Sequence, residues 1–237
     1  SVLSGDLLAN DVPVDVDDKA QINGMLTEPS RADNCYTVVS ASAVDASAVL
    51  DGFTITGGNA DGDADFPYNE ERGGGIFMRE GSPTIRNCTI TTNAALGQGG
   101  GACNYQGDPN YVDCQFIANH SSEGGGAMLN SAGDPNFTDC VFTKNRVHFN
   151  ATGGVMFNQD SNPVIVDCDF VENYGGRVGG AMNNSSSDPT ITGCEFIANT
   201  SRSMAGALSL GTGTFPQITD CVFRHNEASW RGGALYI

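Results

Sequence analysis

Residues 179–199 decide the fold of this 237-residue chain, because they hold a complete copy of a repeated unit. The copy opens with Gly179-Gly180-Ala181-Met182 and continues to Pro189, Cys194 and Asn199, which are spaced five residues apart. The same trio of proline, cysteine and asparagine recurs as Pro83/Cys88/Asn93, Pro109/Cys114/Asn119, Pro135/Cys140/Asn145, Pro163/Cys168/Asn173, Pro189/Cys194/Asn199 and Pro216/Cys221/Asn226. Successive cysteines of the trios lie 26, 26, 28, 26 and 27 residues apart. A repeat of this period is the sequence signature of a solenoid.

A Gly-Gly step before a small or apolar residue opens each unit, with alanine replacing the first glycine once. The steps are Gly74-Gly75-Ile76, Gly100-Gly101-Ala102, Gly125-Gly126-Ala127, Gly153-Gly154-Val155, Gly179-Gly180-Ala181, Ala205-Gly206-Ala207 and Gly232-Gly233-Ala234. We expect a short strand to begin at each step. Its predicted inward row is Phe77, Cys103, Met128, Met156, Met182, Leu208 and Leu235.

Apolar residues within a unit recur at every second position, which indicates strands and not helices. Phe196 follows Cys194 by two residues, whereas Ile191 precedes it by three. Because an odd offset reverses the inward face of a strand, the chain has to bend between these positions. The predicted bends fall on residue types that favour turns: Asn87, Asp113, Asp139, Asp167, Gly193 and Asp220. In a degenerate earlier coil we place Asp51 at the bend, Gly52 at the cysteine position and Asn59 at the asparagine position.

Three short strands and three bends in about 26 residues predict one coil of a parallel β-helix. We therefore expect an all-β, single-stranded, right-handed parallel β-helix of roughly eight to nine coils, because parallel crossovers are nearly always right-handed. Residues 1–48 are expected to form irregular N-terminal rungs or a cap, and residues 49–237 the regular part of one continuous domain. The sequence stops in mid-coil at Leu235-Tyr236-Ile237 without a cap, which favours either a piece of a longer protein or self-association of the open β-helix end.

The repeated cysteines and asparagines are predicted to form two structural ladders along the axis. Stacked asparagines can satisfy the backbone of a buried turn. For the cysteine row we favour free, buried thiols, and the alternatives are disulfides between coils or a redox or metal role. The predicted cysteine ladder is Cys88, Cys114, Cys140, Cys168, Cys194 and Cys221, and the predicted asparagine ladder is Asn93, Asn119, Asn145, Asn173, Asn199 and Asn226.

The paired motifs resemble a known group of proteins. Gly179-Gly180-Ala181-Met182 with Phe196-Ile197-Ala198-Asn199, and their equivalents in other coils, are similar to the repeats of polymorphic outer-membrane proteins of the autotransporter type. The resemblance implies a right-handed β-helix passenger within the broader pectate-lyase-like superfamily. That superfamily includes adhesins, polysaccharide lyases and glycoside hydrolases, so the resemblance leaves the activity open.

The charge and composition of the chain limit the partners and the location that we expect for it. Its 28 acidic and 11 basic residues give a net charge of −17, which argues against nucleic acid and anionic membranes as partners. No signal peptide and no apolar run long enough to insert directly into a membrane is found, and the first residue is serine. We expect a mature or trimmed chain that is secreted or displayed at the cell surface.

One acidic loop has the spacing of a calcium site. Asp61, Asp63 and Asp65 alternate as in the opening of an EF-hand loop, where oxygens at alternate positions converge on one ion. Phe66 stands where that loop has glycine, and Arg72 stands at its twelfth position. We expect either Ca²⁺ or an ordinary solvated acidic loop here.

Two clusters are candidates for binding or catalysis. The first is cationic and aromatic, suits acidic polysaccharides through stacking and carboxylate contacts, and consists of Tyr174, Arg177, Arg202, Trp230 and Arg231. The alternative to a binding site is that each arginine forms an ion pair with a nearby acidic residue. The second comprises Asp169 and Glu195, expected to be stacked neighbours and the weak candidates for a hydrolytic pair.

The sequence therefore predicts an extracellular or cell-surface structural or adhesive protein. One alternative is a carbohydrate-active enzyme, either a polysaccharide lyase or a glycoside hydrolase. The other is a subunit of an extracellular filament.

Overall fold

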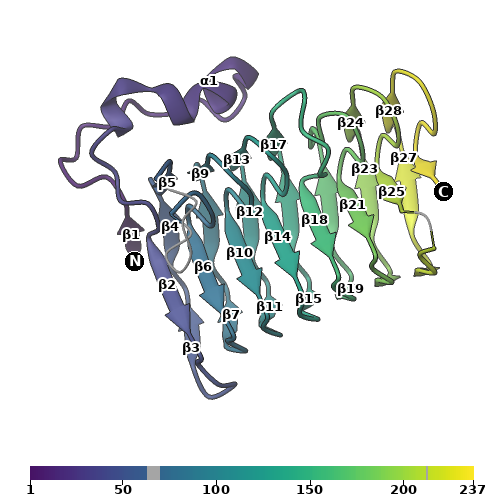
Figure 1. Ribbon diagram of the computed structural model, residues 1–237, viewed down its shortest axis with the longest axis horizontal. Coiled ribbons are helices and arrows are strands. Elements are labelled where there is room, and N and C mark those ends of the chain that lie inside the picture. The colour runs from purple at the N-terminus through teal and green to yellow at the C-terminus, as the bar shows by residue number, and fades with distance from the viewer. Residues whose placement is uncertain (63–69, 212) are drawn as a thin grey trace.

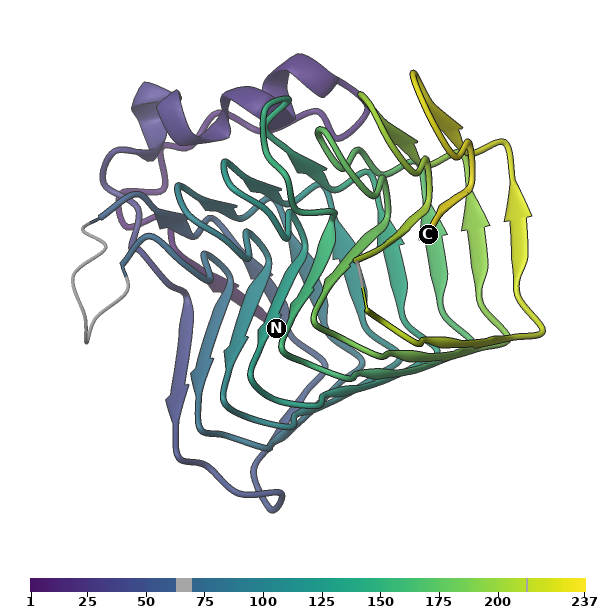
Figure 2. The same ribbon diagram turned by 45° about the vertical axis from the view of Figure 1, so that its right-hand side comes forward.

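The chain is a parallel β-solenoid whose coils stack along one axis (Figure 1). The structure is a computed structural model, and it describes residues 1–62, 70–211 and 213–237. Three long sheets run the length of the solenoid, and a fourth, shorter set of two-residue strands lines one edge (Figure 2). All pairings between named strands are parallel, as the prediction of a β-helix requires.

Sheet A contains the strands that follow the cysteine row. These are β1 (Val2–Ser4), β4 (Thr54–Thr56), β8 (Thr89–Thr91), β12 (Gln115–Ile117), β16 (Val141–Thr143), β20 (Asp169–Val171), β23 (Glu195–Ile197) and β27 (Val222–Arg224). The middle residue of each regular strand points into the core, so that like side chains stack. The rings of Phe142 and Phe170, for example, lie 4.7 Å apart and are nearly parallel, at 4°.

Sheet B contains the strands that follow the glycine step. These are β2 (Val39–Ser42), β6 (Ile76–Arg79), β10 (Ala102–Tyr105), β14 (Met128–Ser131), β18 (Met156–Gln159), β21 (Met182–Ser185), β25 (Leu208–Leu210) and β29 (Leu235–Tyr236). Ile76 and Ala102, not Phe77 and Cys103, pair in register with Met128, so the predicted inward row was wrong in its first two coils. Phe77 and Cys103 instead form a small second cluster with Leu129.

The error arises at two runs of three glycines. Gly73 and Gly99 are the glycines with positive φ, at 66° and 72°, and they correspond to Gly125 at 63°. The Gly-Gly step therefore begins one residue earlier in these coils than predicted. Glycine is favoured at Gly99 because a Cβ there would lie 2.4 Å from the carbonyl oxygen of Ala102.

Sheet C contains the strands that follow the prolines. These are β3 (Val49–Asp51), β7 (Thr84–Arg86), β11 (Asn110–Val112), β15 (Asn136–Thr138), β19 (Val164–Val166), β22 (Thr190–Thr192) and β26 (Gln217–Thr219). Positive φ angles confirm the predicted bends between sheets C and A. In chain order they are Asn87 52°, Asp113 51°, Asp139 53°, Asp167 51°, Gly193 68° and Asp220 53°.

The degenerate first coil is shifted by one residue from its prediction. Asp51 pairs with Arg86, so Gly52, whose φ is 77°, takes the bend and Phe53 takes the place of the cysteine. Asn59 pairs with Ala94, which leaves Gly58 at the position of the ladder asparagine. The Asp51 carboxylate accepts hydrogen bonds from Arg86 Nε at 2.9 Å and Asn87 Nδ2 at 2.8 Å.

Sheet D is a row of two-residue strands along one edge of the solenoid. Its members are β5 (Asn59–Ala60), β9 (Ala94–Ala95), β13 (His120–Ser121) and β17 (Arg146–Val147), and β24 (Thr200–Ser201) and β28 (Glu227–Ala228) continue the row as a separate pair. Tyr174 links the two groups through single bridges to Arg146 and Thr200.

Residues 6–34, which we call the strap, lie over sheet D (Figure 1). The strap contains the helix α1 (Lys19–Gly24) and two short 3-10 helices, η1 (Met25–Thr27) and η2 (Pro29–Arg31). Ile22 and Met25 pack on Ala94 and Ala118. None of the helices in the described part of the chain is long and apolar enough to cross a membrane.

The buried Arg31 fastens the end of the strap, because its Nη2 donates to the carbonyl oxygens of Gly58 at 3.0 Å and Thr92 at 3.1 Å. Two carbonyl acceptors and the nearby Asp11 carboxylate, 3.6 Å from Nη1, compensate the buried charge.

The solenoid has about six turns, so the expected eight to nine coils were too many. The excess came from dividing the full length by 26 residues. Residues 1–72 supply strands to sheets A to D, but much of this segment is spent on the strap and does not build regular turns.

The predicted asparagine ladder runs through the core and is buried. Asn93 Nδ2 donates to the carbonyl of Ile55 at 3.0 Å and to Asn119 Oδ1 at 3.1 Å, and the pattern continues to Asn226. Each rung therefore bonds both to the backbone of a neighbouring coil and to the next asparagine of the row.

Asn173 keeps its place in this ladder but departs from the uniform repeat that the sequence predicts. Its Oδ1 accepts from Asn145 Nδ2 at 3.2 Å, and its Nδ2 donates to Asn199 Oδ1 at 2.9 Å and to the carbonyl of Phe142 at 2.8 Å. After the other ladder asparagines a two-residue strand follows at once, whereas after Asn173 only the single bridges of Tyr174 form. The difference falls in the coil that follows the 28-residue interval, and sheet D is interrupted there.

A second asparagine ladder was not predicted. In it Asn104, Asn130, Asn158 and Asn184 are joined by Nδ2 to Oδ1 bonds of 2.7–2.8 Å. These four side chains lie on the inward face of sheet B and are buried, so the core holds two polar rows among its apolar ones.

All eight cysteines are free, as favoured for the repeated row. Cys88, Cys114, Cys140, Cys168 and Cys194 are buried within the main apolar core, whereas Cys221 is partly exposed. Their sulfurs point toward backbone carbonyl oxygens, as between Cys114 Sγ and the carbonyl of Val112 at 3.4 Å. The row therefore acts as a small apolar element of the core.

Candidate functional site

The turns between sheets D and B present arginine and aromatic side chains from successive coils. Arg177, Arg202 and Arg231 are all exposed, and each lies in one of these turns. The turns are joined through the backbone, since Met204 N donates to Arg177 O at 3.1 Å and Trp230 N donates to Ser203 O at 2.9 Å. Adjacent parallel segments lie about 4.8 Å apart, so the three arginines share one edge of the solenoid.

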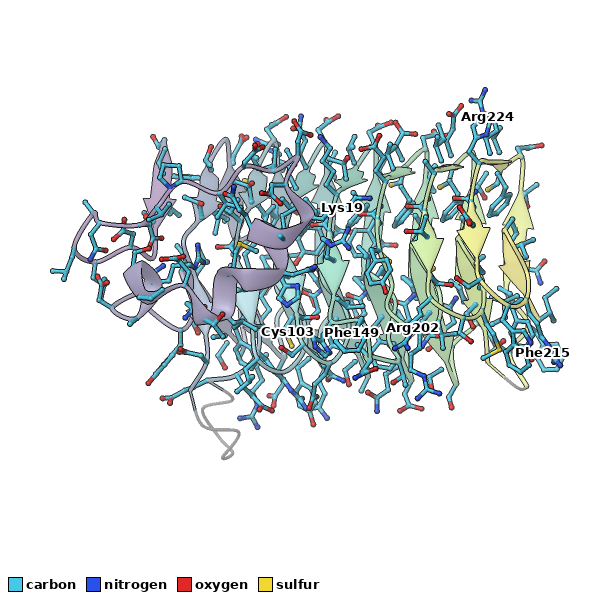
Figure 3. All side chains as sticks on the ribbon, turned by 90° about the horizontal axis from the view of Figure 1, so that it is seen from above. Lys19, Cys103, Phe149, Arg202, Phe215 and Arg224 are labelled. Carbon is cyan, nitrogen blue, oxygen red and sulfur yellow. The ribbon has the colours of Figure 1, made fainter. Side chains whose placement is uncertain are left out.

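Arg202 is held by two contacts with the long turn that lies two coils before it. Its Nη1 donates to Asn150 Oδ1 at 3.1 Å, and its guanidinium lies 5.4 Å from the centre of the Phe149 ring. Phe149 is 48% exposed although it is a large apolar residue. Figure 3 shows Phe149 and Arg202 beside each other on this edge.

Trp230 and Arg231 form a second pair. The Arg231 guanidinium lies 4.3 Å from the centre of the Trp230 ring, and Trp230 remains 65% exposed. An exposed arginine beside an exposed aromatic ring can offer hydrogen-bond donors and a flat apolar face together. We call Phe149, Asn150, Arg177, Arg202, Trp230 and Arg231 the arginine edge.

The arginine edge is not neutralised by the rest of the described chain. Within residues 1–62, 70–211 and 213–237, no carboxylate lies within 4.0 Å of the guanidinium groups of Arg177, Arg202 or Arg231. Exposed arginines elsewhere do have such partners, as Arg86 does with Asp51 at 2.9 Å. The bland alternative of local ion pairs therefore does not hold for these three residues among the described parts of the chain.

A cleft adjoins the arginine edge at Asn150. It has a volume of about 340 Å³ and is lined mainly by polar side chains, namely Gln98, Ser122, Glu123, His148, Asn150, Ala151 and Thr152. Polar groups that converge on a hollow beside an exposed ring can hold a hydroxyl-rich ligand.

Tyr174 does not belong to the arginine edge, although the sequence grouped it there. Its ring lies under the guanidinium of Arg146, at 4.6 Å, where sheet D meets the strap. Phe149 and Asn150 are the residues that sequence reasoning missed. The signal for them is the 28-residue cysteine interval, because the longer coil places extra residues in the turn that carries Phe149.

Asp169 and Glu195 are neighbours on the exterior of sheet A, where β20 pairs with β23. Desolvation raises the pKa of Asp169, and the charge of Glu195 raises it further. Glu195 also forms an ion pair with Arg224 at 3.1 Å. The pair therefore places a carboxyl group that holds its proton more tightly beside a second carboxyl group that is paired with an arginine.

The predicted calcium loop falls mostly outside the described residues, which include Asp61 but neither Asp63 nor Asp65. Asp61 is exposed, and its Oδ2 accepts a hydrogen bond from Asn59 Nδ2 at 3.1 Å. Over the described residues no three His, Cys, Asp or Glu side chains are grouped to hold a metal. Calcium at this loop remains a prediction.

Stacked parallel coils with internal side-chain ladders define the class of the protein as a β-solenoid. A family model described as "Right handed beta helix region" matches residues 31–148, 63–176 and 113–237, so the chain belongs to this family and the predicted right-handed β-helix is confirmed. Comparison with curated proteins and with solved structures gives no match. Kinship with polymorphic outer-membrane passengers remains a prediction.

Proposed function

We propose that this protein is a structural and adhesive β-helix, secreted or displayed at the cell surface, whose arginine edge binds acidic polysaccharides. One observation carries the proposal. In a chain with 28 acidic and 11 basic residues, three exposed arginines on one edge have no carboxylate partner among the described residues. In so acidic a chain, cations that are left unpaired are available to an anionic partner from outside.

The chemistry of the edge fits uronic-acid polymers. Guanidinium groups bind carboxylates through two parallel hydrogen bonds, which a lysine cannot reproduce. Phe149 and Trp230 offer apolar faces on which a sugar ring can stack, and the polar cleft at Asn150 can receive hydroxyl groups. The repetition of arginines along the axis matches a ligand that is itself a repeating polyanion.

The interior supports a scaffold role. The core is filled by stacked rings and ladders of asparagine and cysteine, so the coils hold exterior side chains at a fixed spacing. A rigid array of this kind can bind a polymer by many weak contacts at once.

The test is binding to polygalacturonate, an acidic polysaccharide, compared with dextran, which is neutral. The intact chain should bind polygalacturonate and not dextran. The triple variant Arg177→Gln, Arg202→Gln, Arg231→Gln should bind about tenfold or more weakly, since exposed ion pairs are worth up to about 1 kcal/mol each. The control variant Arg86→Gln, Arg224→Gln removes exposed charges from other faces and should bind as the unaltered chain does. Absence of binding, or equal loss in both variants, would contradict the proposal.

A second candidate function is polysaccharide hydrolysis, and the observation that favours it is the raised pKa of Asp169, on a strand that pairs with the strand of Glu195. A carboxyl group that keeps its proton more tightly can act as a general acid beside a second carboxyl group. Release of reducing ends from polygalacturonate that is lost in Asp169→Asn would support this activity. Intact polymer after prolonged incubation would contradict it.

The filament alternative is checked on the same material. Sedimentation velocity over a range of concentrations should show monomers if the chain binds glycans as a single rod. A concentration-dependent series of larger species would favour self-association of coils.

A further inference from the structure

A second cleft lies between the strap and the solenoid, away from the arginine edge. Its volume is about 280 Å³, roughly that of nine liquid water molecules. The strap contributes Val16, Asp17, Lys19 and Ile22, and the solenoid contributes Lys144, Arg146, Glu172, Ala198 and Thr200. Figure 3 shows Lys19 on the strap where it passes over the coils.

Arg146 is the residue of this cleft that indicates an anionic ligand. It is only 9% exposed, and its Nε donates to Asn23 Oδ1 at 3.0 Å while its guanidinium lies over the Tyr174 ring. Across the described residues no carboxylate comes within 4.0 Å of it. A buried charge without a counter-charge is costly, and Arg146 keeps its charge because a guanidinium does not lose its proton in proteins.

The surroundings hold Arg146 in one orientation. Asn23 fixes Nε from the strap, and Tyr174 supports the plane of the guanidinium from the next coil. Its remaining N–H donors are not used by any carboxylate of the described chain. A planar fork of donors fixed in this way is suited to two-point contact with an oxyanion.

The other charges of the cleft add to this preference. Lys144 forms an ion pair with Asp17, so that carboxylate is already neutralised. Glu172 lies close enough to Lys144 to raise the pKa of its ammonium group, after the larger effect of Asp17. Lys19 has no carboxylate within 4.0 Å among the described residues. The lining therefore has three cationic and two anionic side chains on a chain whose net charge is −17.

We propose that this cleft is a binding site for the oxyanion group of a small ligand, either a carboxylate or a phosphate, with Arg146 and Lys19 as its cationic contacts. The size of the cleft admits the anionic group with a body of about one sugar ring. This site is separate from the arginine edge, and it uses none of the residues on which the proposed function depends.

The experiment is a titration of the full chain at low ionic strength with three probes: sodium glucuronate, inorganic phosphate and the neutral methyl glucoside. The Nε–H signal of Arg146 is followed by NMR, and affinity is measured by calorimetry. Saturable shifts of the Arg146 signal by glucuronate only would assign an acidic sugar. Shifts by phosphate only would assign a phosphorylated ligand, and both would indicate a general oxyanion site. Methyl glucoside should leave the signal unchanged.

Variants separate binding from folding. Arg146→Gln should weaken binding about tenfold or more, and Lys19→Gln about threefold, because one loses a two-point contact and the other an exposed charge. Since Arg146→Gln also loosens the contact with Asn23, the exposed Lys19→Gln is the variant that keeps the fold intact. Arg86→Gln, on sheet C, is the control and should bind normally. No saturable shift with either anion, or unchanged affinity in both Arg146→Gln and Lys19→Gln, would overturn the proposal.

Discussion

Asn119 donates from Nδ2 to Asn145 Oδ1 at 3.0 Å, while its backbone N–H donates to the same oxygen at 3.0 Å. The Nδ2 group of Asn119 also bonds the carbonyl of Ile90 at 2.9 Å. Each asparagine side chain thus bonds two backbone groups of the preceding coil, one N–H and one carbonyl, as Asn119 does with Asn93 N and Ile90 O. Because both side chains are fully buried, water cannot replace these bonds.

Replacement of Asn145 by alanine should be strongly destabilising. The change removes the acceptor of Asn119 and the donor to the Phe116 carbonyl at 2.7 Å, and it leaves buried polar groups without partners. We expect a loss of about 3 kcal/mol or more in the free energy of unfolding, measured by chemical denaturation. Asn136→Ala is the control, because Asn136 makes a partly exposed bond to Asn110, and it should cost less than about 1 kcal/mol. Equal losses of stability in the two variants would show that the buried ladder contributes no more to the free energy of unfolding than a partly exposed asparagine pair does.

Ala132→Gly should stabilise the protein. Ala132 is exposed and has a φ of 55°, which strains any residue with a Cβ. Relief of this strain, worth about 1–2 kcal/mol, should outweigh the cost of glycine's extra freedom in the unfolded chain, about 0.4–1 kcal/mol, and so raise the free energy of unfolding by up to about 1 kcal/mol. The matched control is Ala46→Gly, at an exposed alanine that lacks a positive φ, where the extra freedom of glycine in the unfolded chain should lower stability. The prediction fails if both substitutions change stability in the same direction.

Native thiol labelling should distinguish two classes of cysteine. Only Cys35 and Cys221 are partly exposed, and the other six are buried. Burial raises the pKa of the Cys103 thiol to about 12, which removes the reactive thiolate at neutral pH. Iodoacetamide followed by mass spectrometry should therefore label at most two cysteines in the native chain and all eight after denaturation without reductant. Fewer than eight in the denatured chain would reveal disulfides.

Stability should fall in mild acid because of His120. Burial, and then the charge of Arg146, lowers the pKa of His120 from 6.5 to about 4. Between pH 6.5 and about pH 4 the His120 side chain is therefore protonated in the unfolded chain but neutral in the folded chain. The stabilising contribution of the neutral His120 is present in full above pH 6.5 and is lost as the pH falls from 6.5 to about 4. The loss should approach about 3 kcal/mol.

The check is chemical denaturation at about pH 7 and about pH 4.5 for the unaltered chain, His120→Gln and His225→Gln. The His120→Gln variant should lose less stability on acidification than the unaltered chain. The exposed His225 serves as the control for removal of an imidazole at the surface. An equal loss of stability between the two pH values in all three proteins would rule out a role for His120 in the acid sensitivity of the fold.

The contribution of Asp169 to stability should depend on pH in the opposite direction to that of His120, and Asp169→Asn tests this. Desolvation and Glu195 raise the pKa of Asp169 in the folded chain, so the protonated form is favoured there. The contribution of Asp169 is fully favourable below its unfolded pKa and is lost as the pH rises through the folded value. We expect Asp169→Asn to be more stable than the unaltered chain at about pH 7 and equally stable near about pH 3. A destabilised variant at neutral pH would contradict this assignment.

Much of the fold was readable because each coil repeats the same local chemistry. The five-residue intervals from proline to cysteine to asparagine fixed the strand faces, and the turn-forming types at Asp113 or Asp139 marked bends that the φ angles confirm. The register failed in the degenerate first coil and at two runs of glycines, as at Gly99, where no side chain marks which glycine opens the step. The glycine with positive φ is the one whose Cβ position would lie against the carbonyl three residues later in the same coil, as for Gly99 and Ala102.

The second asparagine ladder and the position of the strap were not predicted, because both depend on contacts between segments that are distant in the sequence. The second ladder was overlooked because buried asparagines are unusual in strands, although Asn104 follows the inward Ala102 by two residues and so shares its face. The position of the strap follows from Ile22 and Met25 on sheet D, which no local pattern encodes.

The coil that follows the longest one shows the same limit at Asn173 and Tyr174. The five-residue spacing placed Asn173 in the ladder, but it gave no sign that sheet D is interrupted directly after it. Likewise, Tyr174 was assigned to the wrong cluster because its partner Arg146 lies one coil away. Both features depend on how this coil packs on a neighbouring coil of unusual length.

The central claim, that the arginine edge binds acidic polysaccharide, is tested most directly by the fluorescence of Trp230. It is the only tryptophan of the chain and lies on the edge itself. Titration with polygalacturonate should change its emission saturably and protect it from a soluble quencher, and dextran should do neither. Unchanged emission and unchanged quenching at saturating polygalacturonate would contradict the account.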